Sequence, residues 1–267
     1  MTLDPATALR LTEALAATGV LLGSLEYLAR PHVLADTSLA GWPVLRLRHP
    51  RYATGVLGAA LSRTVAYPGV LGVLAVRTAA AACLIAAWFH GVVHTALLTI
   101  VVVTTVALVL RGLGGGEGAD QVLRITFCVL LLTALHPTAA TMRLALWFLA
   151  LQAGLAYFSS GIHKLTSPVW LDGTGLTGVL RTRRYGHWRL GAALAAHPSL
   201  ARWASRGVSL AETLFPLVLI APPSWLPAFL GLGVLFHLGC AVVMGLNCFV
   251  WAFTALYPAI AYAVLSR

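Results

Sequence analysis

Charged side chains are scarce in this chain of 267 residues. Only 10% of the residues are charged and 59% are hydrophobic, and the mean hydropathy is +0.87. Soluble domains carry about a quarter of their residues as charged side chains, so this composition excludes an ordinary soluble protein. We therefore expect an integral, multi-pass protein of the cell membrane, with the lipid bilayer as its main partner.

Acidic residues are fewer still, and their number limits the possible chemistry. The chain has eight Asp and Glu residues, without an Asp-rich pair or the spacing HExxH, so the usual divalent-metal sites lack ligands. We therefore predict no metal site. The net charge of +10 comes from arginines between apolar runs. Anionic headgroups and membrane topology account for that pattern, and nucleic acid is not an expected partner.

Cysteine and lysine are also rare. The four cysteines show no CxxC spacing and are interpreted as small core residues. Lys164, which follows His163 at the end of an apolar run, is the only lysine among eighteen basic side chains. A charge at hydrocarbon depth is costly unless it is paired or faces a wet cavity, which favours a functional role. The alternative is a helix end that snorkels to the headgroups.

Apolar runs fill most of the chain and have the length needed to cross roughly 30 Å of hydrocarbon. Because lipid cannot satisfy backbone polar groups, these runs are expected to be helices, including the β-branched stretch at 99–106. The predicted fold class is an all-α polytopic bundle of about eight transmembrane helices that forms a single domain, 1–267. The predicted spans are 7–29, 68–90, 92–111, 122–136, 142–163, 207–221, 225–245 and 248–265.

Most arginines lie in three connectors, at 30–67, 111–121 and 164–206. With eight spans, these connectors share one side of the membrane. The excess of arginine in cytoplasmic loops then places them in the cytoplasm and both termini outside.

One helix carries a polar stripe. Winding 152–165 at 100° per residue places Tyr157, Ser160, His163 and Lys164 on one side. Glu212 and His237 lie in other apolar runs and could meet this stripe. In a pocket of low dielectric constant, Lys164 would tend toward a neutral amine that acts as a general base, and the histidines could move protons. The alternative is that the same groups pair only for helix packing.

The region around Lys164 resembles the HTTM family, the horizontally transferred transmembrane domain shared with vitamin K-dependent γ-carboxylase. The matching segments cover roughly 110–260. They are Tyr157-Phe-Ser-Ser-Gly161, His163-Lys164-Leu165, Trp170-Leu-Asp-Gly173, Gly118-Ala-Asp-Gln-Val-Leu-Arg124, and Phe236-His237 through Phe249 followed by Tyr257-Pro258.

This resemblance implies that Lys164 is the base that activates a lipophilic, quinone-like or isoprenoid substrate, and that a reduced quinone takes part. In this resemblance, His237 matches a histidine of the later helix. Our leading hypothesis adds His163 as a second proton partner and Glu212 as the residue that holds the charge network. The predicted substrate-binding residues are Tyr157, Ser160, Trp170, Asp172, Arg181, Arg183 and Arg184. The chain has no large extramembrane region for a propeptide, which argues against protein γ-carboxylation itself.

Two other functions remain open. Arg181, Arg183, Arg184 and Arg189 could hold the diphosphate of an isoprenoid substrate, as in a terpene cyclase-like enzyme. The second alternative is a non-catalytic accessory protein that helps to mature a small secreted peptide.

Overall fold

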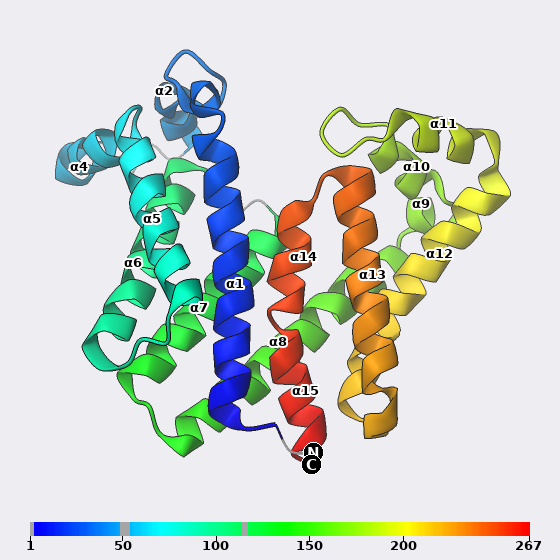
Figure 1. Ribbon diagram of the computed structural model, residues 1–267. Helices are drawn as coiled ribbons and strands as arrows, with labels where there is room; N and C mark the ends of the chain where they lie inside the picture. Colours follow the sequence, from blue (N-terminus) through cyan, green and yellow to red (C-terminus); the bar gives the residue numbers. More distant parts are fainter. Residues whose placement is uncertain (1–2, 49–53, 114–116) are drawn as a thin grey trace. The chain divides into compact units, whose positions relative to one another are not determined.

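The computed structural model describes residues 3–48, 54–113 and 117–267, and these residues form helices and no strand. The predicted all-α polytopic class is therefore confirmed (Figure 1). Parts of two predicted connectors, 49–53 and 114–116, lie outside the described residues. The chain divides into two compact units, Leu9–Met142, and Met1–Ala8 with Arg143–Arg267.

Seven helices in the described ranges are long and apolar enough to cross a membrane. They correspond to seven of the eight predicted spans. They are α1 (Pro5–Leu28), α5 (Gly69–Ala86), α6 (Gly91–Arg111), α7 (Gly118–Leu135), α8 (Ala139–Leu165), α13 (Leu226–Met244), and the pair α14 (Asn247–Thr254) and α15 (Tyr257–Leu265). The β-branched stretch lies within α6, as the lack of hydrogen-bond partners in lipid requires.

The eighth predicted span, 207–221, lies in a segment of different character. It combines the end of α12 (Pro198–Leu214) with the 3₁₀-helix η3 (Phe215–Leu219). α12 is amphipathic, with buried Ser205, Ser209 and Glu212 on one face. α12 has 17 residues and is not among the helices that qualify by length and apolarity.

In the Leu9–Met142 unit, α5, α6 and α7 pack against their neighbours in sequence. Gly112 ends α6 in the left-handed region with φ 89°, a common helix end because glycine has no Cβ. The buried Arg111 then donates hydrogen bonds to the carbonyl oxygens of Leu34, Ala40 and Val65 at 2.7–2.9 Å. The short helices of this connector are η1 (Pro31–Leu34), α2 (Trp42–Leu45), η2 (Arg46–Arg48) and α4 (Gly55–Val65). One guanidinium thus ties η1, the loop before α2 and the end of α4 to α6.

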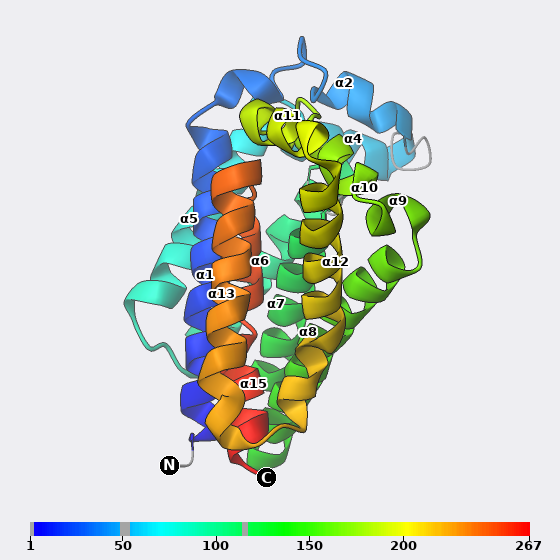
Figure 2. The ribbon, with the colours of Figure 1, turned by 90° about the vertical axis from the view of Figure 1, so that its right-hand side faces the viewer.

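The other unit contains the polar stripe of α8. After α8 the chain forms short helices, α9 (Pro168–Leu171), α10 (Thr174–Leu180) and α11 (Trp188–Ala196), at the end of the unit away from the two termini (Figure 1). α12 then runs toward the end where the termini lie (Figure 2), and η3 and η4 (Pro223–Trp225) form the turn that leads into α13.

Candidate functional site

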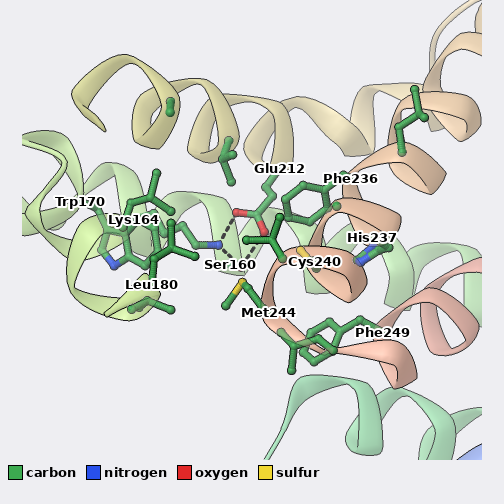
Figure 3. A pocket seen from close by; sticks show the side chains of 18 of the residues that line it. Ser160, Lys164, Trp170, Leu180, Glu212, Phe236, His237, Cys240, Met244 and Phe249 are labelled. Carbon is green, nitrogen blue, oxygen red and sulfur yellow. Dashed lines mark hydrogen bonds and ion pairs between the residues drawn. The ribbon is translucent and has the colours of Figure 1, made fainter. Parts of the chain in front are cut away.

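A largely apolar cavity of about 570 Å³ lies within the Arg143–Arg267 unit, bounded by α8 to α14 (Figure 3). Its volume is in the range of small-molecule sites, roughly 300–1,000 Å³. Leucine, valine, methionine and phenylalanine side chains make most of the lining. The polar or ionisable lining residues are Tyr157, Ser160, Lys164, Glu212, His237 and Cys240.

Lys164 lies in this lining as part of a three-residue hydrogen-bond ring. Its ammonium donates to Ser160 Oγ at 2.7 Å and to a carboxylate oxygen of Glu212. Ser160, one helical turn before Lys164, in turn donates to the other oxygen of Glu212 at 3.1 Å. The ammonium also lies 5.4 Å from the centre of the Trp170 ring, a favourable cation–π distance. An ion pair therefore lies in a largely apolar wall (Figure 3).

The approach of α8 to α12 depends on Gly161. A Cβ at this position would lie 2.4 Å from both the backbone nitrogen and the Oγ1 of Thr213, and 2.8 Å from the Ser209 carbonyl oxygen. These distances are too short for any larger residue. Gly161 stands between Ser160 and Lys164 on α8, and Thr213 follows Glu212 on α12. The missing side chain therefore lets the two helices bring the ion pair together.

A second glycine, Gly173, allows the chain at the end of α9 to pack closely against α12. Its φ is +85°, and a Cβ there would lie 2.6 Å from the backbone of Ala201. Ser205 Oγ donates to the carbonyl oxygen of Trp170 at 2.6 Å, and Arg206 Nε donates to that of Leu171 at 2.9 Å. These bonds hold the Trp170 ring beside Lys164.

At the end of the cavity away from Lys164, the lining is aromatic and includes members of a buried row of hydrogen-bonded polar side chains. His237 Nε2 is 2.7 Å from the hydroxyl oxygen of Tyr157, which is 2.9 Å from that of Tyr257. The imidazole stacks on Phe253 with ring centres 4.4 Å apart. Only 2% of His237 is exposed, and its Nδ1 has no hydrogen-bond partner among the residues that the structure describes. Its second ring nitrogen is therefore an unused polar atom at the cavity wall.

Six of the predicted site residues line this one cavity: Tyr157, Ser160, Lys164, Trp170, Glu212 and His237. His163 is not among the lining residues. Its side chain is exposed, and its Nδ1 lies 2.6 Å from the carbonyl oxygen of Ser159 in its own helix. The helical periodicity of 152–165 predicts His163 on the polar stripe beside Lys164. In the structure, His163 lies one residue before Lys164 on α8 and does not face the cavity.

The remaining predicted residues lie outside the cavity. Exposed Asp172 accepts hydrogen bonds from the hydroxyl and backbone N–H of Thr174, which lower the pKa of its carboxyl group. It shares a smaller hollow of about 310 Å³ with Arg181. Arg183 and Arg184 are exposed in the turn before α11.

Sequence reasoning did not assign Cys240, Gly161 or Tyr257 to the site. Cys240 follows His237 by three residues, so both share one helix face, and that spacing could have been used. The role of Gly161 depends on α12, which is distant in sequence, and no local pattern reveals it.

Among the described residues, no group of three or more His, Cys, Asp and Glu side chains is placed to hold a metal ion. No family model, curated protein or solved structure matches the chain.

Proposed function

We propose that the chain is a membrane enzyme of the HTTM type, in which Lys164 and Glu212 carry out acid–base chemistry on a lipophilic, quinone-like or isoprenoid substrate. The observation that carries the proposal is the Lys164–Glu212 ion pair in the wall of an apolar cavity. A charged pair is expensive in such surroundings. Its presence beside a space of ligand size is therefore better explained by chemistry than by packing.

The pair can supply both a base and an electrostatic partner. Transfer of one proton from the ammonium to the carboxylate converts the ion pair into a neutral amine and a neutral acid. The exchange moves one proton within the pair and leaves neither residue charged. The amine of Lys164 can then accept a proton from an acidic O–H of the substrate. The resulting ammonium remains beside the substrate oxyanion and stabilises its charge.

Other lining residues have supporting roles in this proposal. Trp170 packs over the ammonium and shields the pair from water. His237 and Tyr157 form the polar end of the cavity and are proposed to position the substrate and to exchange protons with it. His163 lies off the cavity and is left out of the mechanism.

The test compares Lys164→Ala with Arg63→Ala, which removes an exposed positive charge in the other unit. Lipid extracts of cells that produce each variant are compared by untargeted mass spectrometry with those of the parent protein. Loss of a general base lowers turnover by about 100- to 10,000-fold, so the product should disappear for Lys164→Ala alone. An unchanged product profile in properly inserted Lys164→Ala would contradict the proposal.

Assays on membranes from the same cells distinguish the two alternative functions, a diphosphate-converting enzyme and an accessory protein. Release of pyrophosphate from an added isoprenoid diphosphate, lost on Arg183→Gln and Arg184→Gln but not on Lys164→Ala, would favour a diphosphate-converting enzyme. If instead Lys164→Arg preserved all function, charge alone would matter, and an accessory role would be favoured.

A further inference from the structure

Lys164 brings the only lysine amine of the chain to the wall of the apolar cavity. The side chain is 18% exposed, and Figure 3 shows its nitrogen directed toward Glu212, among side chains that line the cavity. An amine has two reactivities, because its lone pair can take a proton or can attack an electrophilic carbon. The proposed function uses the first of these, and the surroundings of Lys164 also suit the second.

The cavity is accessible to apolar molecules. Leu200 of α12 and Leu235 of α13 line it and are 57% and 65% exposed, so the space reaches the surface at these two helices. Its largely apolar lining favours a hydrocarbon tail over a polar one. The same lining offers water few hydrogen-bond partners. Condensation of an amine with an aldehyde releases water, so surroundings that exclude water favour the condensed product.

Glu212 limits which product of the amine can persist. Its side chain is 8% exposed and pairs with the ammonium of Lys164. Acylation would turn the amine into a neutral amide and leave the carboxylate as a poorly solvated charge, which is costly. Condensation with an aldehyde gives a protonated imine, which keeps the positive charge on the same nitrogen. Its one remaining N–H can donate to Glu212, while Ser160 keeps its own hydrogen bond to that carboxylate.

We infer that Lys164 binds an apolar aldehyde covalently, as a protonated imine whose counter-ion is Glu212 and whose hydrocarbon tail lies in the cavity. The ammonium first gives one proton to the carboxylate, and the lone pair of the resulting amine attacks the carbonyl carbon. The carbonyl oxygen takes one proton from that nitrogen and one from Glu212 and leaves as water, while nitrogen and carbon form a double bond. One aldehyde is consumed, one water is released, and the pair ends with the same two charges. This binding goes beyond the proposed function and shares with it only the proton transfer within the pair.

Reduction of the imine makes the bond permanent and measurable. The Arg63→Lys variant carries one further lysine at an exposed position of the other unit, which serves as the matched control. The purified variant is incubated in detergent with sodium cyanoborohydride and either decanal or glycolaldehyde, and peptide mass spectrometry gives the alkylation rate of each lysine. The preference for decanal should be about ten-fold stronger at Lys164, which corresponds to the burial of about two methylene groups. Equal preferences at the two lysines, or no alkylation of Lys164 by decanal, would overturn the inference.

The role of Glu212 has a spectroscopic readout. All-trans-retinal absorbs at longer wavelength as a protonated imine than as a neutral one, so its absorption spectrum reports the charge on the nitrogen. At pH 7 the parent protein should give the long-wavelength form, and Glu212→Gln, which lacks the counter-ion, should give the short-wavelength form. A neutral imine in the parent protein, or the same spectrum for both proteins, would also overturn the inference.

Neither measurement requires turnover, so the two proposals fail separately. Trapping of decanal at Lys164, together with unchanged lipid products in cells that produce Lys164→Ala, would refute the acid–base function alone. Loss of product in those cells without trapping in the purified protein would refute the imine alone.

Discussion

Lys164 and Glu212 form a pair whose stability depends on both members being present. Their side chains are 18% and 8% exposed, so removing one leaves the other as a poorly solvated charge. Replacing both with apolar residues removes that cost, and exchanges of this kind are often neutral.

We therefore expect Glu212→Leu to lower the stability of the protein by on the order of 3 kcal/mol, and Lys164→Met/Glu212→Leu to restore most of it. Thermal unfolding in detergent measures both. The double variant should be stable and inactive, which separates catalysis from folding. Equal melting temperatures for the single variant and the parent would show that the pair is well solvated.

His237 offers a second comparison at the scale of one atom. Glutamine places its amide near the position of Nε2, whereas asparagine is shorter and reaches only as far as Nδ1. Nε2 is the atom that pairs with Tyr157, and a buried hydroxyl without its partner costs about 1–3 kcal/mol. His237→Asn should therefore melt at a lower temperature than His237→Gln. The opposite order would mean that Nδ1 makes the more important contact.

At the scale of elements, the close contact of α8 and α12 determines whether the ion pair can form. Gly161→Ala would place a Cβ 2.4 Å from the backbone nitrogen of Thr213, which forces the helices apart. We expect lower stability, by about 1–3 kcal/mol, together with loss of the Lys164–Glu212 contact and of activity. Gly207→Ala is the matched control, because a Cβ there has no atom within 4 Å and alanine favours helix. Similar behaviour of the two variants would contradict this role of Gly161.

The elements themselves were largely predictable, and the site was only partly so. A long apolar run in lipid can satisfy its own backbone hydrogen bonds only as a helix. Seven predicted spans accordingly correspond to apolar helices of the structure. The polar stripe correctly grouped Tyr157, Ser160 and Lys164, because these positions share a face of one helix. Which helix completes the cavity could not be read from local sequence. That depends on Gly161 and on the packing of distant segments.

At the scale of the whole molecule, the ends of the chain constrain how often it crosses the membrane. Leu3, Asp4 and Pro5 line one hollow together with Tyr262 and Ser266, so the two termini lie at the same end of their unit (Figure 1). A chain that begins and ends on one side crosses an even number of times. If each of the seven apolar helices of the described residues crosses once, an even total requires one further crossing.

The segment that can supply it is α12 with η3. It extends from Pro198 to Leu219, between α11 and the turn that leads into α13. Its buried polar face carries Ser205, Ser209 and Glu212, while Leu210, Leu214 and Leu217 are exposed and suit contact with lipid. The cavity allows a crossing helix to be this polar, because its polar residues face protein.

The prediction is that both termini lie outside the cell and the turn at 181–187 lies inside. That turn belongs to a connector with six arginines in 165–206, whereas the short connections 87–90, 136–138 and 220–225 contain none. Loops rich in arginine remain in the cytoplasm. Alkaline phosphatase, active only outside, should be active when fused to either terminus. A fluorescent protein that matures only in the cytoplasm should fluoresce when inserted in the turn. Termini on opposite sides would mean that α12 lies on the membrane surface, whereas both termini inside would preserve eight crossings and reverse only the orientation.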